Sequence, residues 1–226
     1  MWHWQSGECK VLQGHKEQVR GFSVLSNSPS RLLSWSFDGT VKVWDMESGQ
    51  RLQDIEAHRG AILSCHMSPD GSLFTTTSAD KTVKVWCCET WGCVHTLKGH
   101  SECVRSCRFS WDGRCIATGD DNGEIRLWSV TDGSLLKICS REGKDGIDSL
   151  HGGWVTDLHF SPDDSLLVST GGYIKWWDVK RGEALQTFYP KGLGLKKIHV
   201  SLDFSTFVTI DNIGILYVLQ KVTPSV

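Results

Sequence analysis

The chain has 226 residues, with 24 lysines and arginines against 26 aspartates and glutamates, and a formal net charge of −2. This near balance argues against a non-specific binder of nucleic acid or of anionic membranes, because such proteins carry an excess of basic residues. No apolar run approaches the ~18 residues of a membrane span, and the first residues lack the charged and apolar regions of a signal peptide.

A repeat of about 42 residues dominates the sequence. The same tryptophan recurs at intervals of 42, 42, 42 and 49 residues, at Trp2, Trp44, Trp86, Trp128 and Trp177. Histidines recur with nearly the same spacing, at His15, His58, His100 and His151. A period of this length predicts an architecture built from copies of one supersecondary unit.

Each repeat unit predicts four strands in chain order. After the histidine, an alternating apolar stretch such as Ala61–Met67 predicts the first strand, and Ser68–Gly71 has the residues of a type I turn. A second strand leads to a turn that contains aspartate, and the tryptophan strand follows, as in Thr82–Trp86. A glycine after the tryptophan then opens the turn into a fourth strand. Four strands per unit predict an all-β fold, a β-propeller of four-stranded blades.

The repeat also predicts the boundaries of the units. We expect the end of a truncated blade at 1–13, full blades at 14–56, 57–98, 99–139 and 151–189, a degenerate last blade at 190–220, an inserted loop at 140–150 and a tail at 221–226. The chain then holds about five blades and forms an incomplete arc of a larger propeller. Alternatively, the strand left over at 7–13 could complete the last blade and close a five-bladed ring.

A recurring set of polar residues predicts how each blade is locked. The histidine, a strand serine, the turn aspartate and the tryptophan indole can form one hydrogen-bonded chain, which satisfies groups that would otherwise be buried unpaired. This structural role is assigned to His15, Ser36, Asp38, Trp44, His58, Ser78, Asp80, Trp86, His100, Trp128, His151 and Trp177. The fourth unit lacks the aspartate and the fifth lacks all three signature residues, so these two blades are expected to be less tightly locked.

The nine cysteines indicate a reducing compartment. Their number is odd and no CxxC pair occurs. The spacing of Cys103 and Cys107 is what any two residues four apart on a strand would show. We therefore interpret the cysteines as free thiols and expect a cytoplasmic protein without a metal site.

The Gly14-His15 and Trp44-Asp45 pairs resemble the Gly-His and Trp-Asp pairs that mark each repeat of WD-repeat propellers. The resemblance extends over essentially the whole chain. Stretches that the repeat does not dictate, such as Arg31–Trp44, Ala117–Arg126 and His151–Asp157, further resemble the C-terminal propellers of the apoptotic protease-activating factors, a family of apoptosome scaffolds. The repeats are specific for the fold and nearly silent on function.

The second resemblance implies a regulatory sensor that binds cytochrome c. Until cytochrome c binds, the segment would help to hold the nucleotide-binding core of the scaffold inactive, and caspase activation would follow its release. The other implied partners are the upstream nucleotide-binding and propeller domains of the same protein. ATP or dATP is implied only for that nucleotide-binding domain, because this chain has no G-x-x-x-x-G-K-[ST] loop. Oligomerisation is likewise implied only through domains outside this chain.

Two other classes of function stay open at this stage. A general WD-repeat adaptor, for example in ubiquitin ligation or signalling, would carry a different domain upstream. A propeller enzyme would need convergent titratable residues in the central channel. Because the sequence has no G-x-S-x-G motif and no metal-spaced set of His, Asp and Glu, we predict no enzymatic activity, no catalytic residue and no cofactor in this segment, and no nucleic-acid or membrane partner.

Trp154 is the predicted anchor of a partner-binding face. It follows a connection between blades, at a position that holds Gln18, Ala61 and Cys103 in the other units, so blade packing does not explain a tryptophan there. In a propeller, this connection and the turn between second and third strands lie on the same face. Exposed tryptophans are favoured anchors of protein interfaces.

Four aspartates are predicted to form an acidic rim around that anchor. Asp120 and Asp121 belong to the neighbouring turn, where Asp120 stands at the serine position of the other units and Asp121 is an additional acid. Asp145 and Asp148 belong to the inserted loop. Such a rim would complement the surface lysines of cytochrome c and speed its encounter with the propeller.

Overall fold

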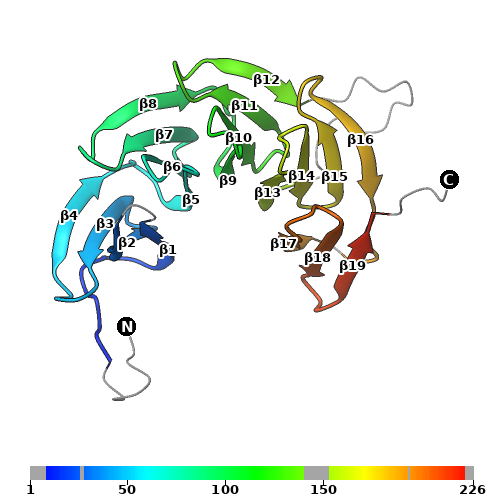
Figure 1. The fold of residues 1–226 in the computed structure, drawn as a ribbon. Coiled ribbons are helices and arrows are strands. Elements are labelled where there is room, and N and C mark those ends of the chain that lie inside the picture. Colours follow the sequence, from blue (N-terminus) through cyan, green and yellow to red (C-terminus); the bar gives the residue numbers. More distant parts are fainter. Residues whose placement is uncertain (1–8, 26–27, 140–152, 193, 222–226) are drawn as a thin grey trace.

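The computed structural model describes residues 9–25, 28–139, 153–192 and 194–221, which form nineteen strands in five antiparallel sheets. The sheets stand side by side along an open arc (Figure 1). The predicted all-β architecture of successive four-stranded blades is therefore confirmed. The described ranges contain no helix, and so none that could cross a membrane.

The strands follow one another in chain order within each sheet. The first blade contains β1 (Val19–Leu25), β2 (Ser28–Ser36), β3 (Thr40–Asp45) and β4 (Arg51–Glu56). The second contains β5 (Ile62–Met67), β6 (Leu73–Ser78), β7 (Thr82–Cys87) and β8 (Cys93–Lys98). The third contains β9 (Val104–Phe109), β10 (Cys115–Asp120), β11 (Ile125–Ser129) and β12 (Leu135–Cys139). The fourth contains β13 (Asp157–Phe160), β14 (Leu166–Thr170), β15 (Ile174–Asp178) and β16 (Glu183–Phe188), and the fifth contains β17 (Leu195–Val200), β18 (Thr206–Asp211) and β19 (Leu216–Gln220).

The order of the strands defines two faces of the arc. The first strand of each blade lies on the inner side of the arc, and β4, β8, β12 and β16 lie on the outer side (Figure 1). Because neighbouring strands are antiparallel, the turn between second and third strands and the connection to the next blade both lie at one end of the sheet. The face that carries these two kinds of loop is called the connection face below.

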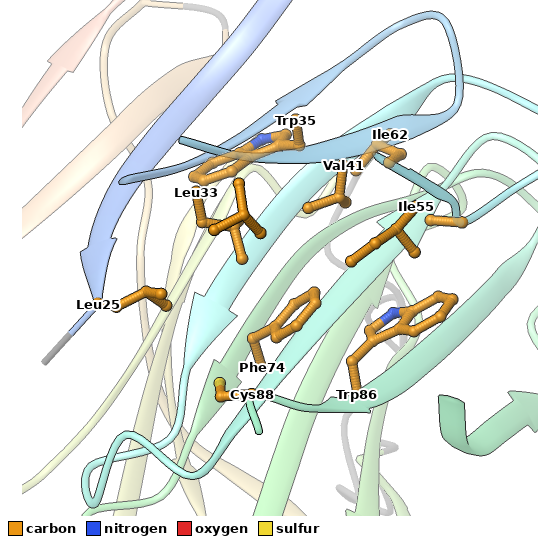
Figure 2. Close-up of a cluster of buried hydrophobic side chains, with 11 residues drawn as sticks. Leu25, Leu33, Trp35, Val41, Ile55, Ile62, Phe74, Trp86 and Cys88 are labelled. Atoms are coloured by element: carbon orange, nitrogen blue, oxygen red, sulfur yellow. The ribbon is translucent and has the colours of Figure 1, made fainter. Parts of the chain in front are cut away.

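Apolar side chains fill the spaces between adjacent blades. Strand alternation sends successive side chains to opposite faces of a sheet, so each blade presents apolar residues to both neighbours. In the first of these clusters, Leu33 and Val41 of the first blade pack with Ile62, Phe74 and Trp86 of the second (Figure 2). The rings of Phe74 and Trp86 stack with their centroids 6.0 Å apart. This burial between sheets, rather than within one sheet, holds the arc together.

The polar chain in each of the first two blades contains the predicted histidine, aspartate and tryptophan, but its hydroxyl group comes from another residue. In the first blade, Trp44 Nε1 donates to Ser34 Oγ at 2.8 Å, and that hydroxyl also lies 2.8 Å from His15 Nε2. His15 Nδ1 lies 3.0 Å from Asp38 Oδ2. Thr76 takes the corresponding place in the second blade.

Ser36 and Ser78, which were expected in these chains, instead stabilise the turns at the ends of their strands. Ser36 Oγ accepts the backbone N–H of Asp38 at 3.1 Å, and Ser78 Oγ accepts that of Asp80 at 3.0 Å. The expectation is corrected because a hydroxyl at the end of the strand lies beside the unpaired turn N–H. The hydroxyl two residues earlier reaches both the indole and the imidazole.

The third blade places Asp120 inside the fold. His100 Nδ1 lies 2.9 Å from Asp120 Oδ2, and Thr118 Oγ1 bridges His100 and Trp128 at 2.7 and 2.8 Å. Asp120 has no exposed surface, and its Oδ1 accepts the backbone N–H groups of Asn122 and Glu124. Asp120 therefore performs the structural role of Asp38 and Asp80 from the serine position, which corrects its assignment to a partner-binding rim.

The last two blades have shortened or substituted locks. In the fourth blade, Trp177 Nε1 donates to Ser169 Oγ at 2.7 Å, while the predicted His151 lies outside the described residues. The fifth blade does contain a buried turn aspartate, contrary to expectation: Asp211 Oδ2 accepts the hydroxyl of Tyr217 at 3.0 Å. Tyr217, on the third strand, thus donates directly to the turn aspartate, whereas the tryptophans of the other blades donate to a serine or threonine hydroxyl.

The two ends of the arc present apolar side chains. Phe22 on β1 is 70% exposed, and Val218 on β19 is 57% exposed. A groove between β16 and β19 is lined by Trp176, Phe207 and Leu219 among others. In the part of the chain that the structure describes, β19 pairs with β18 alone. The five-bladed ring closed by residues 7–13 is therefore not what the structure contains.

Candidate functional site

Trp154 lies on the connection face, where the chain enters β13 from the third blade. Its side chain is 57% exposed, and it follows Gly153, whose φ of 125° favours glycine. The next residue, Val155, is fully buried and donates its N–H to the carbonyl of Asp120 at 3.0 Å. The backbone is therefore docked against the third blade immediately beside an indole that faces solvent.

The close approach of this connection depends on a small residue in β10. A Cβ atom at Gly119 would lie 2.4 Å from Val155 Cγ1. Ser106 Oγ donates to the carbonyl of Val155 at 2.9 Å, so both backbone groups of Val155 bond to the third blade. The position of Trp154 is thus set by contacts between two blades.

Asp121 lies beside Trp154 on the same face, but its carboxylate is not free. Arg105, on β9, donates from Nε to Asp121 Oδ1 at 2.5 Å and from Nη2 to Oδ2 at 2.8 Å. The guanidinium Cζ atom lies 4.0 Å from the centroid of the Trp154 ring. Asp121, Arg105 and Trp154 therefore form one stack, in which a bidentate ion pair supports one face of the indole.

Arg105 was not anticipated from the sequence. It sits within the first strand of a blade, where the repeat carries no fixed residue type, and its contacts join β9, the β10–β11 turn and the connection to β13. Only the packing of two blades brings these three segments together. Of the other predicted rim residues, Asp145 and Asp148 lie outside the described residues.

Other acids on the connection face are also paired with bases. Glu102 lies 3.5 Å from Lys81 Nζ, and Glu124 forms a close ion pair with Arg126. Within the described residues, the surroundings of Trp154 are thus a mixed-charge surface. Surface pairs of this kind contribute little to stability and are screened by salt.

A second group of titratable side chains lies on the inner strands. Arg108 Nη2 lies 2.7 Å from His159 Nε2, and His159 Nε2 lies 3.6 Å from Asp157 Oδ2. His66, on the neighbouring blade, accepts the backbone N–H of Phe109 through Nδ1 at 3.2 Å. These contacts join three successive inner strands, and the polar atoms are used in contacts between blades.

One further cluster has the composition of a metal site, formed by His100, Asp120 and Glu124. The ligand atoms of His100 and Asp120 are already engaged in the lock of the third blade, with Thr118, each other and backbone N–H groups. A metal ion would have to displace these hydrogen bonds. The cluster is therefore read as structural.

His66 predicts a pH-dependent stability. Burial, reinforced by the nearby charge of Arg108, lowers the pKa of His66 to about 3. In the unfolded chain the group titrates near 6.5. Between those values the unfolded state binds more protons, so the free energy of unfolding is expected to decrease as the pH falls from about 6.5 towards 3, by at most ~1.4 kcal/mol per pH unit for this proton.

The His66→Asn variant tests this pH dependence, because asparagine can still accept the N–H of Phe109 but cannot titrate. Urea unfolding at pH 7.5, 6.0 and 4.5 should show a smaller loss of stability in His66→Asn than in the wild type. His199→Asn, which removes an exposed imidazole, is the matched control. Equal pH slopes in all three proteins would contradict the prediction.

Comparison with known proteins places the chain in a defined group. It is 72% identical over 98% of its length to apoptotic protease-activating factor 1 of Danio rerio, and 55% identical over 97% of its length to the protein of that name in Homo sapiens. The chain spans 18% and 17% of the lengths of those two relatives. A shorter match, 33% identical over 29% of the chain, is to coronin-7 of Mus musculus.

The repeat model described as "WD domain, G-beta repeat" matches four segments, residues 7–45, 49–87, 91–129 and 147–178. These segments cover more than half of the chain. They contain the first three strands of each of the first four blades, together with β4 and β8, whereas β12 and β16 lie outside them. Each matched segment ends one residue after a tryptophan of the repeat, at Trp44, Trp86, Trp128 or Trp177. The chain belongs to the WD domain, G-beta repeat family.

Proposed function

We propose that this chain is a non-catalytic sensor segment of an apoptosome scaffold, which binds cytochrome c through the surface around Trp154. Together with the rest of the molecule it helps to hold the nucleotide-binding core inactive until cytochrome c arrives, and caspase activation follows. The observation that carries the proposal is the 72% identity over 98% of the chain to a protein named as an activating factor of a protease in apoptosis.

The exposed indole is the feature of the described surface that suits a protein partner. Trp154 is 57% exposed, and a partner lysine could pack on an exposed part of its ring. Asp121 contributes a partly neutralised acid, and Asp145 and Asp148 of the inserted loop stay candidates for the acidic rim. Cytochrome c, with its many surface lysines, fits these features.

The remaining parts of the proposal concern the whole protein. The upstream nucleotide-binding and propeller domains are the expected intramolecular partners, with ATP or dATP bound to the former and oligomerisation through those domains. The protein would act in the cytoplasm. This segment would have no turnover of its own and would contribute binding alone.

Replacing Trp154 with alanine in the full-length protein tests the proposed site. Truncation of an exposed aromatic anchor typically costs ~2 kcal/mol or more, about 30-fold in Kd. We expect isothermal titration calorimetry with cytochrome c to show a loss of this size. Trp111→Ala is the matched control, because Trp111 is 54% exposed in the β9–β10 turn on the opposite face.

The alternative function, a general WD-repeat adaptor, gives a different result in the same experiment. An adaptor of another complex would show no binding of cytochrome c by the wild-type protein, and Trp154→Ala would change nothing in that assay. Equal losses in Trp154→Ala and Trp111→Ala would instead contradict the placement of the site.

A further inference from the structure

We propose that Arg105 is a positioning residue for Trp154, held in place by Asp121, and that Asp121 acts on the partner chiefly through Arg105. The inference rests on the proposed function, because it concerns how the same surface presents its anchor. It assigns Asp121 a role different from that of a free acid in a rim, and it brings in Arg105, which the sequence did not indicate.

The guanidinium group has the geometry of a clamp. Its Nε and Nη2 atoms donate to the two oxygens of Asp121 at 2.5 and 2.8 Å. A bidentate pair of this kind fixes the plane of the guanidinium, because the planar fork matches the carboxylate. The pair uses the edge of the guanidinium and leaves its flat faces free, and the centroid of the Trp154 ring lies 4.0 Å from Cζ.

The main chain at this point is already held, so the side chain is what Arg105 controls. Val155 donates its N–H to the carbonyl of Asp120 and accepts a hydrogen bond from Ser106 Oγ. An exposed tryptophan on such a docked backbone could still occupy several rotamers. Contact with the clamped guanidinium selects one of them before the partner arrives, which reduces the ordering cost of binding.

The charges of Arg105 and Asp121 allow the positioning role to be distinguished from direct binding of the partner by Asp121. A partner lysine that approached Asp121 would meet a carboxylate whose two oxygens already accept from Arg105. If Asp121 bound lysine directly, Arg105 would compete with the partner, and its removal would strengthen binding. If Arg105 positions Trp154, its removal weakens binding. The two roles therefore predict opposite effects for one substitution.

The test is binding of cytochrome c to the full-length protein carrying Arg105→Gln, measured by surface plasmon resonance. We expect Kd to rise about 3- to 10-fold, the usual effect of leaving one large side chain to be ordered on binding. Asp121→Asn should weaken binding in the same direction and should add little in the Arg105→Gln background. Tighter or unchanged binding by Arg105→Gln, or additive effects of the two substitutions, would overturn the proposal.

Two controls separate positioning from a general effect of charge or fold. Arg59→Gln removes the same charge from an exposed position on the connection face of the second blade, and we expect it to leave Kd unchanged. Arg105→Gln in a Trp154→Ala background should also leave Kd unchanged, because a positioning residue has no effect once its target is gone. If Arg105 only stabilised the fold, Arg105→Gln would weaken binding both in the wild-type background and in the Trp154→Ala background.

A spectroscopic measurement keeps the inference testable if the wild-type protein does not bind cytochrome c. In protein labelled with 5-fluorotryptophan, the fluorine resonance of Trp154 is identified by its absence from the Trp154→Ala spectrum. We expect Arg105→Gln to shift it and Arg59→Gln to leave it in place. Absence of binding with such a shift would refute the proposed function alone, whereas an unshifted resonance would refute the positioning role.

Discussion

The Trp177→Ala variant is expected to lose about 3–5 kcal/mol of the free energy of unfolding, the usual cost of deleting a fully buried tryptophan. Trp177 has no exposed surface and packs with Leu158, Leu167 and other residues between the third and fourth blades. Its Nε1 group also donates to Ser169 at 2.7 Å. The substitution would therefore open a cavity and remove a buried hydrogen bond at the same place.

Urea unfolding monitored by circular dichroism measures this loss, with Trp154→Ala as the matched control. Because Trp154 is 57% exposed, its truncation should cost less than about 1 kcal/mol of stability. Trp177→Ala would then lower the stability of the fold, whereas Trp154→Ala would lower the affinity for the partner. Equal shifts of the urea midpoint would contradict this division.

Replacing Asp120 with alanine should destabilise the protein by roughly 3 kcal/mol, because each buried donor that is left without its acceptor costs about 1–3 kcal/mol. Burial by itself would raise the pKa of Asp120, but hydrogen bonds from His100 and from the backbone N–H of Glu124 hold it below the usual value. The ionised carboxylate is thus the stable form in the fold. Its loss leaves the imidazole and two turn N–H groups without their acceptor.

The neighbouring residue provides the control for this experiment. Asp121→Ala removes a carboxylate from a partly exposed ion pair with Arg105, and such pairs contribute up to about 1 kcal/mol. Thermal unfolding should therefore show a large decrease in Tm for Asp120→Ala and a small one for Asp121→Ala. A reversed order would mean that the third blade is not locked through Asp120.

Asp120 and Asp121 are adjacent in the sequence but have different environments in the third blade. In the first two blades the locking acid is the third residue of the turn, as Asp38 and Asp80. In the third blade the lock contains Asp120, at the position that Ser36 and Ser78 hold in the first two blades, and Asp121 lies on the connection face. Variation in a single turn thus keeps one acid in the buried lock and places a second acid on the connection face.

Much of the fold was predictable because its signals are local and periodic. The 42-residue spacing of Trp44, Trp86 and Trp128, with alternating apolar residues before each, indicated four-stranded blades packed face to face. Alternation along a strand is a property of the backbone, so it can be read without knowing the neighbours. The exposure of Trp154 could be anticipated for the same reason, since the repeat required no apolar residue at its position.

The partners of individual side chains were decided by the tertiary structure alone. The sequence does carry a hydroxyl ten residues before each of three repeat tryptophans, at Ser34, Thr76 and Thr118, but only the folded blade shows that this group bridges the indole and the imidazole. The placement of Asp120 inside and Asp121 outside depends on the conformation of the turn. Arg105 joins the site because β9 and the connection to β13 pack together across two blades. Periodicity determines which face of a strand a residue occupies, whereas distances between blades determine what it touches, and those distances arise only when the sheets pack.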